Sequence, residues 1–268
     1  MSRIDTTFAR LKQENRAAFV AYLAAGDPTL EQTPALVAAL EAAGADIIEL
    51  GLPFSDPLAD GVVNQMAADR ALKAGATTRG VLRMIEQIRR VSEIPLVLFT
   101  YLNPVYTYGY QEFHRDAAAA GADGILPLDL PPEEADCHSE LSQHVGLQQI
   151  RLISPTTPAA RIPVITGRAE GFIYYVSREG VTGVQDSLAV NLEAQVAAIK
   201  AHTNVPVCVG FGIHTPAQAI SVARAADGVV IGSAIVRTIE QNQNAPDLAD
   251  KLYAFAAPLA EAIRTARV

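Results

Sequence analysis

Short apolar runs rich in Val, Ile and Leu recur along the chain, and a longer Ala-rich stretch of helical character follows each of them. Continuous runs of this kind are typical of strands covered on both faces, and hence of a parallel sheet. The pattern predicts eight strands, at residues 18–24, 46–51, 95–101, 124–128, 147–153, 171–177, 206–210 and 228–232.

Eight strand–helix repeats within about 250 residues predict a (β/α)8 TIM barrel, formed as a single domain by residues 1–268. A doubly wound open sheet is the alternative, because it shares the alternation but more often has fewer strands. An additional N-terminal helix from Ile4 to Glu14 is expected to close the bottom of the barrel. Four helical stretches begin at residues able to cap them, namely Thr29, Thr78, Ser187 and Thr215.

Composition and charge narrow the class of protein. Half of the 268 residues are apolar, and 21 Lys and Arg against 29 Asp and Glu give a net charge of −8. This acidity disfavours nucleic acid or an anionic membrane as a partner. The chain starts without an apolar targeting segment and has no run of roughly 18 apolar residues, so we expect a cytoplasmic protein. Cys137 and Cys208 lack the spacing of a disulfide framework or zinc site.

Two carboxylates fall at the end of the second predicted strand, where TIM barrels carry their chemistry. Glu49 lies among apolar residues in IIELG and points either into the barrel mouth or outward toward a helix. If it points inward, its apolar surroundings raise the carboxyl pKa until the group can both give and take a proton near neutral pH. Asp60 follows in the loop GLPFSDPLADG and can face the same site. Asp56 in that loop is more simply interpreted as a turn residue, and this alternative stays open for Asp60.

Glycine clusters follow the last two predicted strands, in VGFGIHTP and VVIGSAIV. Glycine lets a backbone approach a phosphate closely, and a helix that starts at Gly232 and Ser233 offers amide donors and partial positive charge. No Lys or Arg occurs between Ala201 and Ala223, so backbone dipoles would do most of this work. A pair of tight turns is the alternative interpretation.

The remaining polar residues restrict the reaction. The segment SREGVTGVQDS at 177–187 has the composition of a lid that closes on substrate. No lysine falls at the C-terminal end of a predicted strand, so a Schiff-base mechanism has no nucleophile. Among the five histidines only His214 lies in a predicted top loop, which disfavours a His-ligated metal. The sequence therefore predicts carboxylate chemistry on a phosphorylated molecule that supplies its own electron sink.

At these residues the sequence resembles the tryptophan synthase alpha subunit family, over nearly the whole chain. The motifs that carry the resemblance are AGDP (25–28), IELGLPFSDPLADG (48–61), TYLNP (100–104), DLPPEE (129–134), SREGVTG (177–183), GFGI (210–213) and IGSAIV (231–236). The resemblance implies a (β/α)8 barrel that cleaves indole-3-glycerol phosphate into indole and glyceraldehyde 3-phosphate by a retro-aldol reaction. It also implies a beta subunit that joins indole to serine with pyridoxal phosphate, in an αββα heterotetramer, while this chain itself needs no cofactor and no metal.

The resemblance also implies roles for individual residues. Glu49 would move protons between indole C3 and the glycerol hydroxyl, and Asp60 would accept a hydrogen bond from the indole N–H. The other expected substrate-binding residues comprise the pocket positions Tyr22, Phe99, Leu126 and Tyr174, the lid positions Thr182 and Gly183, and the phosphate-end positions Phe211, Gly212, Gly232 and Ser233. Ordinary core packing is the alternative for the aromatic residues.

Some positions depart from the family pattern. Val62 and Asn64 stand where the family often has Pro and an aliphatic residue, and Asn64 is expected to add a polar atom near the ring. Pro127–Leu128 also differs from the family pattern. The segments Leu52–Pro57 and Asn103–Tyr108 are predicted to dock the beta subunit, with packing on their own barrel as the alternative. Three other functions stay open: a stand-alone lyase that releases free indole, a non-catalytic activator of a beta subunit, and another sugar-phosphate enzyme.

Overall fold

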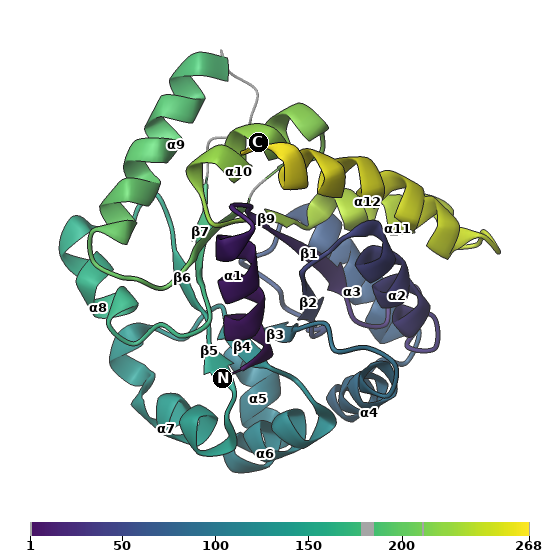
Figure 1. The fold of residues 1–268 in the computed structure, drawn as a ribbon. Coiled ribbons are helices and arrows are strands. Elements are labelled where there is room, and N and C mark those ends of the chain that lie inside the picture. Colours follow the sequence, from purple (N-terminus) through teal and green to yellow (C-terminus); the bar gives the residue numbers. More distant parts are fainter. Residues whose placement is uncertain (1, 178–184, 211, 268) are drawn as a thin grey trace.

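The computed structural model describes residues 2–177, 185–210 and 212–267, in which helices surround a ring of strands (Figure 1). The strands are β1 (Ala18–Ala24), β2 (Ile47–Gly51), β3 (Leu96–Thr100), β4 (Gly124–Pro127), β5 (Gln148–Gln149), β6 (Arg151–Ile153), β7 (Ile173–Val176), β8 (Val207–Gly210) and β9 (Gly228–Ile231). The α-helices are α1 (Arg3–Gln13), α2 (Thr33–Ala43), α3 (Val62–Lys73), α4 (Thr78–Arg89), α5 (Leu102–Tyr108), α6 (Tyr110–Ala120), α7 (Asp136–Val145), α8 (Ile162–Thr166), α9 (Gln185–Lys200), α10 (Pro216–Ala225), α11 (Ser233–Asn242) and α12 (Leu248–Thr265). Two 3₁₀ helices span Pro132–Glu134 and Ala159–Arg161. A search of the described helices for an apolar stretch of bilayer length finds none.

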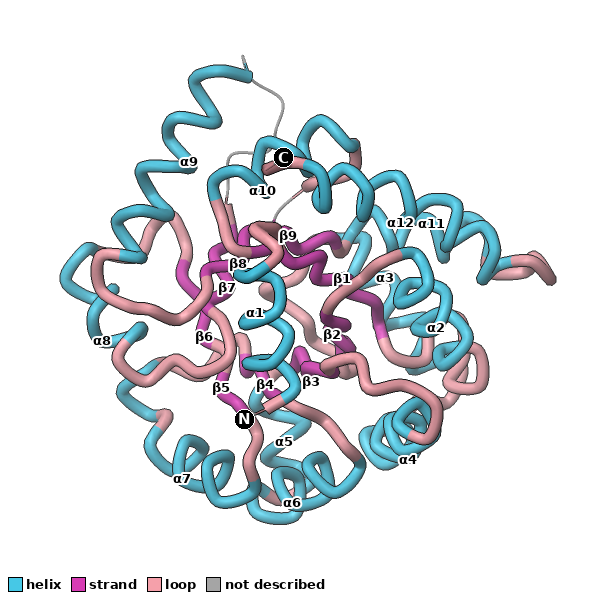
Figure 2. The backbone as a smooth tube through the Cα atoms, in the orientation of Figure 1, coloured by secondary structure: helices cyan, strands magenta, loops and turns pink. Residues whose placement is uncertain are grey.

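The strands form one parallel sheet in the order β5-β4-β3-β2-β1-β9-β8-β7-β6, which curls into a barrel (Figure 2). The two end strands, β5 and β6, are separated only by Ile150, whose N–H donates to the carbonyl of Ile125 at 3.0 Å. The predicted strand at 147–153 is therefore split into two short pieces, one paired with β4 and the other with β7. These pairings close the barrel, which confirms the predicted TIM barrel and makes the open sheet wrong.

Side chains along each strand alternate between the barrel interior and the surrounding helices. In β1, Phe19 and Leu23 pack outward against the helices, whereas Val20 belongs to the interior cluster. Because both faces are buried, the strands read as continuous apolar runs. Ile47 of β2 is also in the interior cluster, so Glu49, two residues further along the strand, points into the barrel as well.

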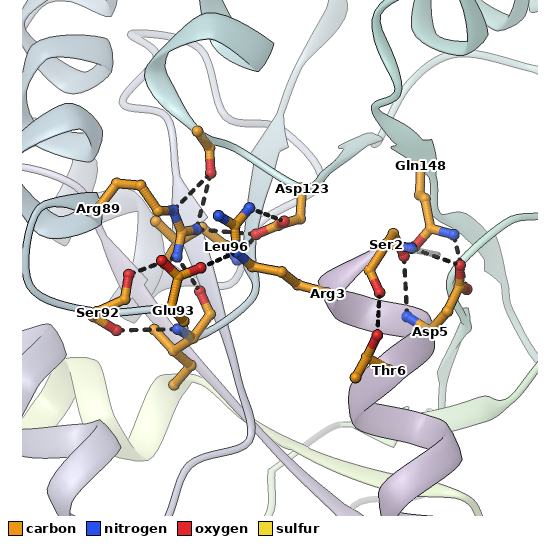
Figure 3. Close-up of polar contacts among 12 residues, drawn as sticks. Ser2, Arg3, Asp5, Thr6, Arg89, Ser92, Glu93, Leu96, Asp123 and Gln148 are labelled. Atoms are coloured by element: carbon orange, nitrogen blue, oxygen red, sulfur yellow. Dashed lines mark hydrogen bonds and ion pairs between the residues drawn. The ribbon is translucent and has the colours of Figure 1, made fainter.

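Helix α1 lies across the N-terminal end of the barrel and closes it (Figure 1). Its buried face consists of Ile4, Phe8 and Leu11, which pack into the interior cluster. Ser2 caps the helix through a capping box with Asp5, and both side chains also hydrogen-bond Gln148 (Figure 3). The predicted N-terminal helix is confirmed, with both ends shifted by one residue.

Three aspartates that directly precede strands fasten the same end of the barrel. Asp46, Asp123 and Asp227 each accept a backbone N–H from a neighbouring strand, at 2.9–3.0 Å. The residues that donate are Phe19, Leu96 and Val207, respectively. Each carboxylate also pairs with cations: Arg10 and Arg16 at Asp46, Arg3 and Arg89 at Asp123 (Figure 3), and Lys200 at Asp227. These contacts tie successive strands to one another and to the helices.

Of the predicted helix caps, one is confirmed. Thr215 caps α10 and forms a capping box with Gln218. The cap of α4 is Thr77 rather than Thr78, because Thr77 is the residue with extended backbone and its hydroxyl accepts the N–H of Gly80. Thr29 and Ser187 are not caps. Thr29 lies in the turn before α2, whose first residue is Thr33, and Ser187 lies inside α9.

Candidate active site

Glu49 is a fully buried carboxyl group near the C-terminal end of β2, in register with Tyr22 of β1 and Val97 of β3. Neither of its oxygens has a hydrogen-bond partner among the described residues. Burial raises the pKa of the Glu49 carboxyl from 4.5 to about 8. A group with such a pKa can donate a proton near neutral pH and then take one back. An unpaired buried acid costs stability, so its presence here points to a functional role.

Asp60 lies in the loop between β2 and α3, where it accepts a hydrogen bond from the hydroxyl of Tyr101 at 3.0 Å. The same hydroxyl accepts the backbone N–H of Ala59 at 3.0 Å, which holds the loop against the end of β3. Burial raises the pKa of Asp60, while hydrogen bonds from Tyr101 and Asn64 oppose the shift. Asp56 is exposed; its carboxylate accepts from the hydroxyl of neighbouring Ser55, and its backbone carbonyl accepts the N–H of Leu58 at 2.9 Å, as the turn interpretation predicts.

A cavity of about 260 Å³ opens at the C-terminal end of the barrel. Its lining comes from strand ends and from the starts of α3 and α11, and consists of Tyr22, Glu49, Gly61, Val62, Val63, Asn64, Phe99, Tyr174, Gly212, Val230, Gly232, Ser233 and Arg237. Asp60 lines a small adjoining void that shares Tyr22, Phe99 and Asn64 with the cavity. Burial, with the charges of both Glu49 and Asp60, raises the pKa of Tyr22. Both carboxyl groups are therefore close enough to Tyr22 to influence its ionisation.

Aromatic rings form one wall of the cavity. Tyr22 meets Phe99 edge-on with ring centroids 5.0 Å apart, and Phe99 meets Tyr174 edge-on at 6.5 Å. Rings in this arrangement offer an apolar surface to a flat aromatic ligand. Leu126, expected in the same pocket, is fully buried in the interior cluster, and Phe99 and Tyr174 pack against that cluster. It is not among the side chains that line the cavity.

Another part of the cavity lining offers free backbone donors at the start of α11. Gly232 is the N-cap of α11 and Ser233 its first residue, with no side chain capping the free N–H groups there. Gly212 has φ of +68°, a conformation that favours glycine. Arg237 lines the cavity one turn further along α11, on the same helix face as Ser233. Three predicted residues, Thr182, Gly183 and Phe211, lie outside the described residues.

The sequence-based interpretation missed two contributors to this site, Tyr101 and Arg237. A signal for each was present. Tyr101 is the last residue of a predicted strand, at the edge where such ends meet, and Arg237 stands four residues after Ser233 in a predicted helix. Asn64 was identified as a departure from the family pattern that adds a polar atom near the ring, and it lines both the cavity and the void that Asp60 lines.

Comparisons with known proteins agree with this geometry. The sequence profile described as tryptophan synthase alpha chain matches residues 8–264. The chain belongs to the tryptophan synthase alpha chain family. The tryptophan synthase alpha chain of Opitutus terrae is 51% identical over 260 residues, covering 97% of this chain and 98% of the relative. That of Caulobacter vibrioides is 47% identical, covering 99% and 98%.

Solved structures give the same family and the same fold. The crystal structure of tryptophan synthase subunit alpha from Legionella pneumophila str. Paris matches with a TM-score of 0.91 at 42% identity, covering 98% of both chains. A chain of tryptophan synthase from Mycobacterium tuberculosis matches with a TM-score of 0.88 at 36% identity, again covering 98% of both. As a tryptophan synthase alpha chain, the protein is a lyase that cleaves indole-3-glycerol phosphate to indole and glyceraldehyde 3-phosphate.

Proposed function

We propose that Glu49 and Asp60 carry out this cleavage as an acid–base group and an anionic stabiliser, respectively. The observation that carries the proposal is the isolation of Glu49, a fully buried carboxyl group without a hydrogen-bond partner among the described residues. Its pKa of about 8 leaves it largely protonated near neutral pH. Asp60 is held by Tyr101 in a more polar setting, which suits an anion. Two carboxyl groups in different environments can thus take different roles.

In the proposed reaction Glu49 gives one proton to the substrate and takes one back, so it ends in its starting protonation state. Glu49 donates its proton to C3 of the indole ring, and the ring nitrogen becomes iminium-like. The resulting carboxylate of Glu49 takes the proton of the glycerol hydroxyl next to the ring. The bond between C3 and the glycerol carbon breaks, its electron pair neutralises the ring, and the hydroxyl carbon becomes the aldehyde of glyceraldehyde 3-phosphate. Asp60 accepts a hydrogen bond from the ring N–H and stabilises the positive charge that develops there.

The phosphate end of the substrate fits the start of α11. Gly232 and Ser233 present backbone N–H groups there, and the helix N-terminus carries partial positive charge. Arg237 is the one cationic side chain among the described residues that line the cavity. We assign it to the phosphate because a guanidinium can donate to two phosphate oxygens together. Gly212 belongs to the same end, and Thr182, Gly183 and Phe211 remain predicted substrate contacts.

Glu49→Gln tests these roles most directly. Because Gln keeps the shape of the side chain but cannot exchange a proton, indole release should fall by at least about a thousandfold. Binding of indole-3-propanol phosphate, which cannot be cleaved, should be retained within a few-fold. Indole release is followed spectroscopically and binding by calorimetry. Near-normal turnover of the variant would refute the assignment of roles.

We also propose that the protein works with a beta subunit that holds pyridoxal phosphate, in an αββα heterotetramer. Exposed apolar side chains lie beside the two predicted docking segments, as expected for a protein contact. Leu58 and Val62, which follow the first segment, are 90% and 73% exposed, and Tyr106 of the second is 68% exposed. Leu52 itself is buried, so the contact centres on Leu58 rather than on the start of that segment.

Replacing Leu58 with Asp tests the docking surface. A charge at this exposed position should lower the turnover gained on adding the beta subunit by about tenfold, because it must be desolvated on docking. Turnover of the isolated chain should stay within twofold. Val91→Asp is the matched control, since Val91 is 86% exposed but precedes β3 and so lies at the opposite end of the barrel. If adding the beta subunit did not change the turnover of the wild-type chain, the protein would instead be a stand-alone lyase.

A further inference from the structure

Asn64 lies in the first turn of α3, at the boundary between the two empty spaces of the site. It lines the 260 Å³ cavity together with Glu49. It also lines the adjoining void together with Asp60, to which its side chain donates a hydrogen bond. The Asn64 carboxamide therefore borders both the cavity that Glu49 lines and the void that Asp60 lines.

The charge of Asp60 fixes the orientation of this carboxamide. A carboxylate can only accept hydrogen bonds, so the NH₂ group of Asn64 faces Asp60 and its Oδ1 faces away. That Oδ1 is buried and has no hydrogen-bond partner in the part of the chain that the structure describes. The oxygens of Glu49 share this condition. Buried acceptors in folded proteins are nearly always paired, so the donor is expected to come from a ligand.

We propose that Asn64 Oδ1 is a second acceptor for the ring N–H of the substrate, beside Asp60, and that Asn64 is thereby a specificity-determining residue. This inference rests on the proposed function, which directs the ring N–H toward Asp60. Asn64 touches Asp60, so its free oxygen is the next acceptor available to that N–H. The interaction strengthens as the ring becomes positive during protonation of C3, which favours the transition state over the bound substrate.

The test compares two uncleavable probes that differ in one ring atom: indole-3-propanol phosphate and its benzothiophene counterpart, in which sulfur replaces N–H. Calorimetry measures both against the wild-type chain, Asn64→Leu and Asn64→Ala. We expect either substitution to weaken the indole probe about tenfold and to change the benzothiophene probe by less than twofold. Leu fills the volume of Asn and Ala adds no bulk, so agreement between them excludes a packing artefact.

Asn204→Leu is the matched control, because Asn204 is exposed before β8, at the N-terminal end of the barrel, and should leave both affinities unchanged. Equal weakening of both probes by the Asn64 variants would mean that Asn64 only shapes the site, and would overturn this inference while leaving the proposed function intact. Failure of the wild-type chain to bind either probe would overturn both.

Discussion

Glu49 and three aspartates at the N-terminal end of the barrel are buried acids in opposite surroundings. At the N-terminal end, Asp46 and Asp123 are 7% and 6% exposed, and each accepts a backbone N–H and meets two arginines. Asp227 repeats the arrangement with Lys200. At the C-terminal end, Glu49 is fully buried and has no such partner among the described residues. Asp46 directly precedes β2 and Glu49 is the third residue of that strand, so the difference is local.

This contrast separates stability from function within one fold. Paired carboxylates fasten neighbouring strands, and removal of one leaves its partners buried and unpaired. An unpaired carboxyl group instead disfavours its own ionised form, which costs stability but creates a group able to exchange protons. TIM barrels in general carry their chemistry at the C-terminal ends of the strands. Here the unpaired Glu49, rather than the fold class alone, points to the C-terminal end as the active one, although another buried acid at that end, Asp27, is paired with Arg70.

The largest effect on stability is expected from Asp123→Ala. The change removes a shared partner of Arg3 and Arg89 and leaves the N–H of Leu96 without its acceptor. We expect a loss of about 4 kcal/mol in the free energy of unfolding, and a fall in Tm of roughly 12 °C. Urea and thermal denaturation measure the two quantities, and indole release by the folded variant should stay within twofold.

Asp69→Ala is the control for that experiment, because Asp69 forms an exposed ion pair with Lys73 on the surface of α3. Its loss should be about 0.5 kcal/mol or less. Similar small losses for both variants would show that the buried aspartates do not fasten the strands.

Glu49→Gln should increase the free energy of unfolding, whereas Asp123→Ala should decrease it. The folded state raises the pKa of Glu49 from 4.5 to about 8, so it binds this proton more tightly than the unfolded chain does. The stability contributed by the raised pKa of Glu49 is therefore fully present below about pH 4.5. As pH rises from there toward 8, the free energy of unfolding falls by about 1.4 kcal/mol per pH unit. Gln does not titrate, so the variant should be more stable than the wild type by about 3 kcal/mol at pH 7, and the gap should nearly close at pH 5.

Urea denaturation of both chains at the two pH values measures this difference. Because every other titrating group is common to the pair, the change in the gap reports Glu49 alone. A gap that does not depend on pH would mean that Glu49 is ionised in the folded chain, and the proposed acid–base role would fail with it.

Much of the fold could be predicted because strands buried on both faces leave continuous apolar runs. Seven of the eight predicted strands match single observed strands with small differences at their ends. The fifth is split at Ile150, and the buried side chain of Arg151 hydrogen-bonds Gln149 across the break in a contact that no periodicity reveals. The predicted cap of α4 was wrong for a local reason. Thr77 and Thr78 are chemically alike, and the backbone conformation decides which of them caps α4.

The site was predictable where a residue conflicts with its surroundings. Glu49 stands out because an acid within an apolar strand needs a reason to be there. Tyr101 does not stand out, since an aromatic side chain is ordinary at a strand end, and Asn64 stands out only against the family pattern. Their roles depend on how the loop that carries Asp60 folds back over β3. The sequence also did not indicate that Leu126 packs with the interior cluster rather than lining the cavity.

The smallest effect is expected from Arg237→Gln and concerns substrate binding. Arg237 is a cation that lines the cavity and, like Glu49, differs from the paired charges at the other end of the barrel in its proposed contact with substrate. Arg237→Gln removes one charged donor from the proposed phosphate site but leaves the N–H groups of α11. We expect KM for indole-3-glycerol phosphate to rise about tenfold, or about 1.4 kcal/mol, with kcat within twofold, because the phosphate does not take part in the bond changes.

Arg237→Lys should recover part of the loss. Arg83→Gln, at an exposed position on α4, removes the same charge away from the cavity and should leave KM unchanged. Raising the salt concentration should increase the KM of the wild type more than that of Arg237→Gln, because screening weakens the contact that the variant already lacks. An unchanged KM in Arg237→Gln would assign phosphate binding to the backbone alone.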